Sequence, residues 1–351
     1  MTSAVSITSA LEAMLDGPRP DTVTLGVVVS LSGVMGVAGP GILNAARLAA
    51  EEGATTMDRP LRLVVIDAGQ GPWQTARDVA AVIGSTGLDG IVGAHTSDVR
   101  VAIERTVAGR VPYVFTPPHE SVQPTGSTVF IGDGPVAQLR EPVRALMHDG
   151  RVRRWALIGN DYVWPRSMHA AARAVIADLG GQVVYDRLVP VGVADADELV
   201  DQVMRSAPHA VLVSLIGRDG IVFHRAFGAS AAARSCLRLC TALDENCLLA
   251  AGGDDTGTLF SAMPFFDVDG NGFGSIHAAY THRYGAPAPT PGAYAVGCYD
   301  GVRLLADVVG RRADIAHTGA SAYARLRTRS PVGLARAAGT WLEPVAAGGR
   351  P

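Results

Sequence analysis

Gly159-Asn160-Asp161-Tyr162-Val163-Trp164-Pro165-Arg166 lies between two segments of different pattern. The apolar run 155–158 before it is typical of a buried parallel strand, and the amphipathic run 168–179 after it is typical of a helix. The stretch therefore predicts a loop at the carboxyl end of a strand, where open α/β sheets bind ligands. It carries two aromatic rings, an amide and a carboxylate before a proline placed to begin a helix. An ordinary strand-to-helix turn is the competing interpretation.

Apolar and amphipathic runs alternate on both sides of this stretch. Strands are predicted at 24–30, 61–67, 90–93, 112–116 and 128–131, and again from 155 and at 183–189, 210–215, 237–242 and 259–266. The alternation predicts an α/β fold of two doubly wound, Rossmann-like lobes joined by a multi-strand hinge. We assign 1–21 to an N-terminal extension, 22–134 with 266–325 to the first lobe, and 135–265 with 326–351 to the second. A ligand cleft between lobes that close about a hinge is the corresponding expectation.

Composition excludes several classes of protein. The chain has 351 residues, 48% of them hydrophobic, and a formal net charge of −3. No basic block suggests nucleic-acid binding, and the clusters 151–154 and 325–329 are interpreted as solvated arginines. No apolar run is long enough to span a bilayer. The start of the chain, with Glu12 and Asp16, does not resemble a signal peptide, so we expect a cytoplasmic protein, or a periplasmic or extracellular one if a leader has been removed.

Motifs for catalysis, cofactors and metals are missing from the sequence. There is no P-loop, no Gly-x-Gly-x-x-Gly fingerprint and no Gly-x-Ser-x-Gly nucleophile elbow. The segment 267–272 begins like a calcium loop, but Ala278 stands where a bidentate Glu is needed. The four cysteines have no zinc-site spacing and are interpreted as buried thiols. We expect no catalytic residue, cofactor or metal.

Several loops together resemble one known family. The quoted stretch 159–166, the opening Leu31-Ser32-Gly33, the loop 93–100, the run 114–120 and the triplet 264–266 occur in the order found in periplasmic-binding-protein type I solute-binding proteins. They are most similar to the branch of urea and short-chain amide binding proteins of ABC transporters, which also holds the cytosolic amide sensor of bacterial amidase operons. The resemblance covers roughly residues 22 to 310.

The resemblance implies a set of ligand-binding side chains. It places a ligand hydroxyl on Ser97 and pocket aromatic rings on His95 and Phe115, both of which depart from the Tyr of the amide sensor. It also implies a hydroxyl on Thr116 and second-lobe aromatics on Tyr162 and Trp164. Further pocket loops are expected at Asp244 and at Ser32. Hydroxyls supply donors and acceptors and aromatic walls exclude water, which together favour a small, polar, uncharged ligand. Plain packing is the competing interpretation for each residue.

Three functions remain open at this point. The first is a cytosolic amide sensor, which the resemblance would pair with an RNA-binding antiterminator. The second is the solute-binding component of an ABC importer for urea, amides or branched-chain amino acids, with a permease as partner. The third is an enzyme with two Rossmann-like lobes, such as a glycosyltransferase, for which the sequence offers neither a nucleotide-phosphate site nor a catalytic carboxylate. The oligomeric state, including a homodimer, is open.

Overall fold

The computed structural model describes residues 5–55, 57–120, 128–263, 273–311, 315, 319 and 333–345, with only the backbone of 273–275. Contacts between residues divide the chain into unit 1, Met1–Gly132 with Gly270–Arg329, and unit 2, Asp133–Asp269 with Ser330–Pro351. The chain passes from one unit to the other after Gly132, Asp269 and Arg329. The predicted features at 264–266, 267–272 and 325–329 lie outside the described residues.

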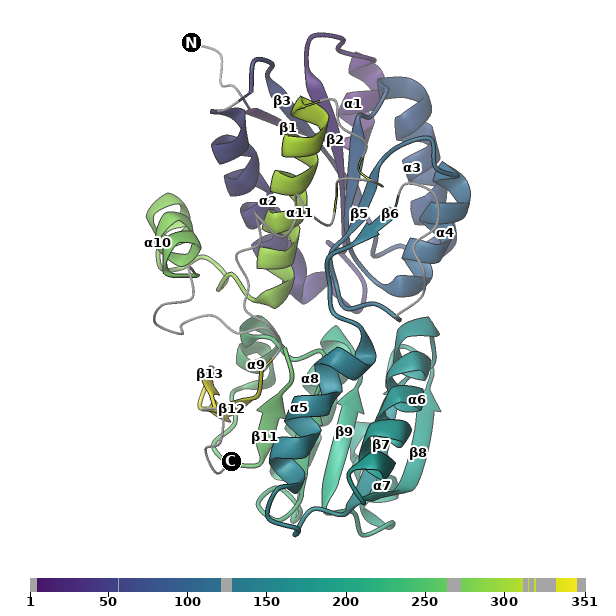
Figure 1. The fold of residues 1–351 in the computed structure, drawn as a ribbon, viewed down its shortest axis with the longest axis vertical. Helices are drawn as coiled ribbons and strands as arrows, with labels where there is room; N and C mark the ends of the chain where they lie inside the picture. The colour runs from purple at the N-terminus through teal and green to yellow at the C-terminus, as the bar shows by residue number, and fades with distance from the viewer. Residues whose placement is uncertain are drawn as a thin grey trace. The chain divides into compact units, whose positions relative to one another are not determined.

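A parallel sheet forms the centre of unit 1 (Figure 1). In spatial order its strands are β1 (Val5–Ser9), β3 (Leu61–Asp67), β2 (Val23–Val29), β4 (Gly90–Ala94), β5 (Tyr113–Phe115) and β6 (Thr128–Phe130). The order reverses at β2, because β3 pairs with one side of it and β4 with the other. The carboxyl ends of β2 and β4 are therefore the topological switch point of this unit, where ligands of open α/β sheets bind.

Helices cover both faces of this sheet (Figure 1). On one face α2 (Gly39–Ala54), preceded by the short 3-10 helix η1 (Gly36–Ala38), packs beside α11 (Ala293–Gly310), and α10 (Phe273–Tyr284) contacts α2. On the other face α3 (Pro72–Thr86) packs beside α4 (Ser97–Val107). All seven residues of the valine-rich β2 are buried, as expected for a strand covered on both faces.

The first residues of the chain add a strand and a helix that apolar patterning did not predict. β1 pairs with the edge of β3, and α1 (Ala10–Asp16) packs against α3. A capping box between Ser9 and Glu12 begins the helix. Arg62 of β3 is fully buried and donates to Thr8 Oγ1 at 3.2 Å and to Asp16 Oδ2 at 3.3 Å. The N-terminal extension is thus anchored to unit 1 by a side chain of the central sheet.

Unit 2 repeats the same design. Its sheet has the spatial order β13 (Trp341–Pro344), β12 (Ala335–Ala338), β11 (Leu259–Ser261), β10 (Leu237–Cys240), β9 (Ala210–Ser214), β7 (Arg154–Asn160) and β8 (Gln182–Val189). The strands from β7 to β11 are parallel, and β12 and β13 form an antiparallel hairpin at the edge. The order reverses between β7 and β9, which makes their carboxyl ends the switch point of unit 2.

Helices also cover both faces of the second sheet (Figure 1). The helix α5 (Pro135–Met147) packs beside α6 (Val163–Asp178) on one face. On the other face α8 (Gly217–Ala229) packs between α7 (Ala196–Met204) and α9 (Glu245–Ala251). The predicted class, α/β with two doubly wound parallel lobes, is confirmed.

The structure shows the surroundings of two groups of residues singled out in the sequence, the arginines of 151–154 and the four cysteines. Arg153 donates to Leu179 O and Arg154 to Ala207 O and Ser206 O, so these arginines satisfy carbonyl groups at and beyond the ends of helices. The four cysteines, Cys298 of unit 1 among them, are buried, as predicted.

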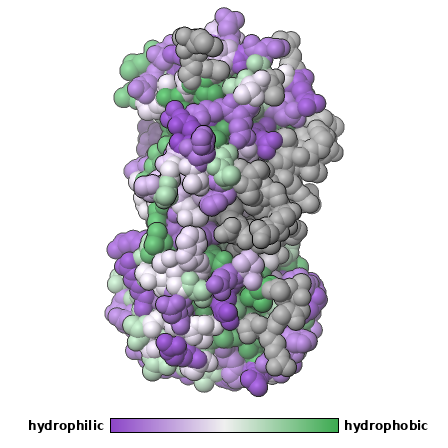
Figure 2. Space-filling view, turned by 90° about the vertical axis from the view of Figure 1, so that its left-hand side faces the viewer, coloured by the Kyte–Doolittle hydropathy of each residue, from purple (hydrophilic) through white to green (hydrophobic). Residues whose placement is uncertain are grey.

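The surface agrees with the composition. Figure 2 shows a face on which hydrophilic residues predominate and hydrophobic ones form smaller patches. Within the described part of the chain, no helix is both long enough and apolar enough to cross a membrane.

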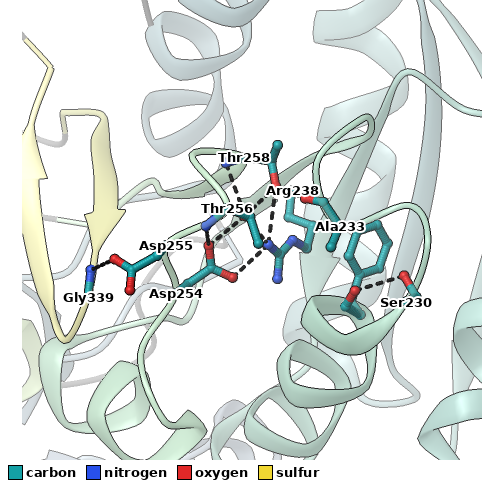
Figure 3. Close-up of polar contacts among 9 residues, drawn as sticks. Ser230, Ala233, Arg238, Asp254, Asp255, Thr256, Thr258 and Gly339 are labelled. Carbon is teal, nitrogen blue, oxygen red and sulfur yellow. Dashed lines mark hydrogen bonds and ion pairs between the residues drawn. The ribbon is translucent and has the colours of Figure 1, made fainter.

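A buried ion pair lies at the amino end of the sheet in unit 2 (Figure 3). Arg238, the second residue of β10, is fully buried and donates through Nη2 to Asp254 Oδ2 at 2.7 Å, Thr256 Oγ1 at 2.9 Å and Thr258 Oγ1 at 3.2 Å. Its guanidinium carbon lies 4.8 Å from the centroid of the Phe227 ring. Asp254 N and Asp255 Oδ1 bond the turn residue Gly339, so this network also holds the β12–β13 hairpin.

Removing one member of this pair tests its contribution to stability. Burial by itself raises the pKa of Asp254, but the charge of Arg238 and bonds from Thr256 bring the pKa below its ordinary value of 3.8. Arg238→Met leaves a buried carboxylate without its cation, so we expect the free energy of unfolding of unit 2 to fall by about 3 kcal/mol at neutral pH. Urea unfolding followed by tryptophan fluorescence measures it, since three of the four tryptophans of the chain, the buried Trp155 of β7 among them, belong to unit 2.

The pH dependence and a matched variant complete this test. A lowered carboxyl pKa stabilises the fold above the ordinary value, so the difference between wild type and Arg238→Met should shrink as the pH falls below about 4. The same substitution at the exposed Arg336 of β12 should change stability by less than about 0.5 kcal/mol. Equal stabilities of Arg238→Met and wild type at neutral pH would contradict the assignment.

Candidate functional site

The predicted ligand residues lie at the carboxyl edges of the two sheets, and each unit is described by itself. In unit 1, Ser32 follows β2, His95 and Ser97 follow β4, and Thr116 follows β5. In unit 2, Tyr162 and Trp164 follow β7, and Asp244 follows β10. The loops after β2 and β4 in unit 1, and after β7 and β9 in unit 2, stand at the switch points.

Ser97 combines burial with a free hydroxyl. It is the first residue of α4, it is 2% exposed, and its hydroxyl has no hydrogen-bond partner among the described residues. The preceding residue, Thr96, has an extended backbone (φ −73°, ψ 156°) and makes no side-chain cap to the helix. The first amide groups of a helix carry partial positive charge and lack partners within the helix. Ser97 therefore presents a donor or an acceptor beside a group of amide donors.

His95 uses both ring nitrogens inside unit 1. Nδ1 lies 3.0 Å from the carbonyl oxygen of Thr96, and Nε2 lies 3.0 Å from the Tyr113 hydroxyl. Since a carbonyl oxygen only accepts, Nδ1 carries the proton and Nε2 accepts from Tyr113. Burial lowers the pKa of His95 to about 4. A Cβ on Gly93 would lie 2.6 Å from Nε2, so the absence of a side chain there makes room for the ring.

Phe115 and Thr116 are also engaged within unit 1. The Phe115 ring is fully buried, with its centroid 5.5 Å from that of His95 and 6.1 Å from that of Phe130. Thr116 is 2% exposed and donates through Oγ1 to the carbonyl oxygen of Gly93 at 3.2 Å. His95 and Phe115 are thus brought together as one ring cluster, and the Thr116 hydroxyl keeps only acceptor capacity for another group.

Ser32 belongs to a separate network around Asp67. The carboxylate at the end of β3 accepts from Ser32 Oγ at 2.7 Å and from the backbone amides of Leu31, Ser32 and Gly69 at 2.9, 3.3 and 2.8 Å. Burial opposes ionisation, but these hydrogen bonds dominate and lower the pKa of Asp67. Its charge therefore holds the loop after β2 to the loop after β3.

The quoted stretch is folded more tightly than its pattern suggests. β7 continues through Asn160 and α6 already begins at Val163, so the loop is reduced to Asp161 and Tyr162. Trp164 lies in the first helical turn and is 4% exposed, and its indole Nε1 has no partner among the described residues. The predicted start after Pro165 is wrong because proline is tolerated within the first turn, where its missing amide costs no helical bond. Tyr162 caps the helix and is partly exposed.

The charged residues of this loop neutralise each other. Arg166 donates through Nε to Asp161 Oδ1 at 2.8 Å, and both side chains are exposed.

A buried amide and a buried carboxylate beside this loop were missed by sequence reasoning. Asn160 is fully buried and donates through Nδ2 to Asp219 Oδ2 at 2.7 Å, while its Oδ1 accepts from the Ile216 amide at 2.9 Å. Asp219, in the first turn of α8, is 1% exposed. Nothing in the local pattern marks two residues 59 positions apart as partners, and only their positions after adjacent strands β7 and β9 could have suggested it.

Asp244 and Gln138 organise another part of the same edge. Asp244 is 2% exposed and begins α9 by accepting from the Cys247 amide at 2.9 Å, and burial raises its pKa. Gln138 of α5 is fully buried and donates through Nε2 to the carbonyl oxygens of Thr241 and Ala262 at 2.7 and 2.8 Å. The ends of β10 and β11 are therefore tied to α5.

The arrangement offers recognition more than reaction chemistry. In unit 1 the buried His95 is neutral and engaged on both nitrogens, which leaves it no free base. Across the described ranges, no group of three His, Cys, Asp or Glu side chains could hold a metal ion. Among the described residues, the free polar atoms at or beside the strand ends include the Ser97 hydroxyl, the Trp164 indole N–H and Gln138 Oε1, which bind neutral or partly charged ligand atoms.

Comparison with known proteins gives a consistent result. A family model described as "Periplasmic binding protein" matches residues 22–345. The fold is similar to that of an ABC transporter substrate-binding protein from Sphaerobacter thermophilus, with 19% identity and a TM-score of 0.73 over 93% of this chain and 97% of that chain.

Two further structures are similar to a comparable degree. One is a solute-binding protein of an ABC transporter from R. palustris in complex with 4-hydroxybenzoate (18% identity, TM-score 0.73, 90% of this chain and 93% of that chain). The other is a fatty acid ABC transporter substrate-binding protein from Thermomonospora curvata (16% identity, TM-score 0.75, 91% and 90%). At these identities the likeness shows the fold.

The neutral state of His95 predicts how unit 1 responds to acid. The unfolded chain binds a proton on this side chain near pH 6.5, whereas the folded chain does so only near pH 4, so stability should fall as the pH drops through this range. His95→Gln removes this contribution, and its free energy of unfolding should change less between pH 7 and pH 4.5. Urea titrations followed by circular dichroism at the two pH values measure the difference.

An exposed histidine of the same unit provides the control for this prediction. His282→Gln in α10 should leave the wild-type pH dependence unchanged. A His95→Gln variant with the full wild-type loss of stability would show that His95 is protonated in the folded state, contrary to its assigned hydrogen bonds.

Proposed function

This chain belongs to the periplasmic binding protein family, and we propose that it is the solute-binding component of an ABC importer, working outside the cytoplasmic membrane with a permease as its partner. Its ligand is a small polar molecule such as a short amide, urea or a similar compound. The similar structures are described as ABC transporter or substrate-binding proteins, which supports this function better than the cytosolic sensor expected first from the sequence.

The observation that carries the proposal is the free hydroxyl of Ser97. Ser97 is 2% exposed, and its hydroxyl makes no hydrogen bond among the described residues, so it is available to a ligand. It stands at the switch point of unit 1 and at the beginning of α4. A ligand oxygen or N–H group is the partner that this position lacks.

Trp164 supplies a comparable argument in unit 2. Its indole N–H is buried and without a partner among the described residues, four positions after the end of β7. An indole only donates, so it requires an acceptor such as a carbonyl or carboxylate oxygen. Tyr162, partly exposed at the cap of the same helix, is the second aromatic contact that we assign.

The other predicted residues receive different roles. We assign to Thr116 an acceptor role toward a ligand N–H group, because its hydroxyl already donates a hydrogen bond to the carbonyl oxygen of Gly93. His95 and Phe115 form the ring cluster behind Ser97, Ser32 holds the loops around Asp67, and Asp244 holds the start of α9. These four support the site rather than contact the ligand.

Charge favours a neutral ligand. Arg166 is neutralised by Asp161, and Arg218 is exposed. A buried carboxylate on the ligand would be expensive without a paired cation, whereas an amide or urea needs only hydrogen bonds. Two of the similar proteins are in complex with 4-hydroxybenzoate and benzoate, and another is a fatty acid ABC transporter substrate-binding protein, so anionic ligands belong in the test as the contrasting class.

Calorimetric titration of the full chain with acetamide, butyramide, urea, leucine and benzoate tests the ligand class. We expect micromolar binding of a neutral amide or urea. Ser97→Ala should weaken it about fivefold, corresponding to the loss of one hydrogen bond of about 1 kcal/mol. Trp164→Phe, which keeps an aromatic ring and removes the N–H, should weaken it to a similar extent.

Ser235→Ala is the matched control, since this serine is exposed in unit 2 and its hydroxyl bonds only the carbonyl oxygen of Ala232. Its affinity should equal that of the wild type. Binding of benzoate or leucine alone would contradict the neutral-ligand assignment. Unchanged affinity in both Ser97→Ala and Trp164→Phe would contradict the site.

The partner distinguishes the importer from the sensor. We expect the ligand-loaded protein to stimulate ATP hydrolysis by its ABC permease in proteoliposomes. Ligand-dependent binding to an RNA-binding regulator, without any effect on a permease, would instead establish the sensor.

A further inference from the structure

We propose that Asn160 and Asp219 are positioning residues for the ligand site of unit 2, because they lock three loops at the carboxyl edge of its sheet into one arrangement. The inference rests on the proposed function for what the loops bind, and on the hydrogen bonds alone for how the loops are held.

The first step concerns the three hydrogen bonds that the Asp219 carboxylate accepts. Oδ2 accepts from Asn160 Nδ2 at 2.7 Å and from the Gly192 amide at 2.8 Å, and Oδ1 accepts from the Val193 amide at 3.0 Å. Asp219 forms no ion pair within the described residues, and it is the third residue of α8. Its buried charge is therefore stabilised by N–H groups and by the amino end of the helix.

The second step is that these donors come from different loops. Asn160 ends β7, Gly192 and Val193 lie in the loop between β8 and α7, and Asp219 itself follows β9. Asn160 closes the set, since its Oδ1 accepts from the amide of Ile216, the residue that precedes α8. The Asp161 amide adds a bond of 2.7 Å to the carbonyl oxygen of Val189. The loops after β7, β8 and β9 thus share one network.

The third step connects this network to the ligand residues. Tyr162 is two positions after Asn160 and Trp164 is four positions after it, with only Asp161 and Tyr162 outside regular structure. A shift of Asn160 therefore moves the start of α6 and both aromatic side chains. The segment 190–192 is exposed, and the bonds that the structure records for its Gly192 amide and for Val193 go to Asp219. Without the Asp219 carboxylate, the Gly192 and Val193 amides would lose these hydrogen bonds.

Asp219→Asn is the sharpest test because it keeps the shape of the side chain. Both carboxylate oxygens accept, so the new NH₂ group faces an N–H donor whichever way the amide is turned. We expect hydrogen exchange at Gly192 and Val193 to accelerate at least tenfold. We also expect affinity for the amide or urea bound by the wild type to fall at least tenfold.

Asp254→Asn is the matched control. It makes the same substitution at a buried carboxylate of the same unit, but beside Arg238 at the amino end of the sheet (Figure 3). It should lower the unfolding midpoint and leave both the exchange of Gly192 and Val193 and the ligand affinity at wild-type values. A role in general stability alone would make the two variants behave alike, and that result would overturn the proposal.

A second variant covers the case in which Asp219→Asn fails to fold. Asn160→Ser removes the amide without adding a charge, and the same faster exchange and weaker binding are expected. If the wild type binds none of acetamide, butyramide, urea, leucine and benzoate, the proposed function fails, and exchange alone decides the positioning role. Faster exchange in either variant but not in Asp254→Asn supports that role, and wild-type exchange in both overturns it.

Discussion

A carboxylate that accepts hydrogen bonds from the backbone of neighbouring loops organises the carboxyl edge of each sheet. Asp67 holds the loops after β2 and β3 in unit 1, and Asp219 with Asn160 holds those after β7, β8 and β9 in unit 2. Loop amides at this edge have no strand to pair with, and leaving them buried and unpaired would cost stability. A single carboxylate satisfies several of them, and so fixes the loops without filling the switch point with side chains.

Hydrogen-bond partners are also the basis on which we propose some of the predicted residues as supporting and others as ligand-binding. His95, Thr116 and Asp244 have aromatic or polar groups of the kind that bind ligands, but each is engaged within its own unit. Ser97 and Trp164 are as deeply buried; the Trp164 indole N–H is a buried atom without a partner, and the Ser97 hydroxyl makes no hydrogen bond among the described residues. We base the proposed ligand contacts on such available atoms at the strand ends, together with the identity of the side chain.

Sequence patterning found the strands because a strand covered by helices on both faces must be apolar along its whole length, as β2 and β9 are. It also predicted that the loop after β7 lies at the carboxyl edge of the sheet. It missed β1, whose partly buried residues lack a continuous apolar run, and it began α6 too late because Pro165 is accommodated inside the first turn. The Asn160–Asp219 pair and the His95–Tyr113 bond were beyond its reach, since each depends on how side chains at the ends of neighbouring strands meet in space.

Proteins of this fold share their sheets but differ in the ligands they bind. The family fold requires two doubly wound sheets with their switch points, and structures with 14% to 20% identity preserve it. One such protein is in complex with benzoate and another is a fatty acid ABC transporter substrate-binding protein, so the backbone does not determine the ligand. We propose that the side chains left unpaired at the strand ends determine the ligand. In this chain that set includes the Ser97 hydroxyl and the Trp164 indole N–H, while Arg166 of the quoted loop is exposed and bound to Asp161. A neutral hydrogen-bonding ligand is the chemistry that such a set can satisfy without burying an uncompensated charge.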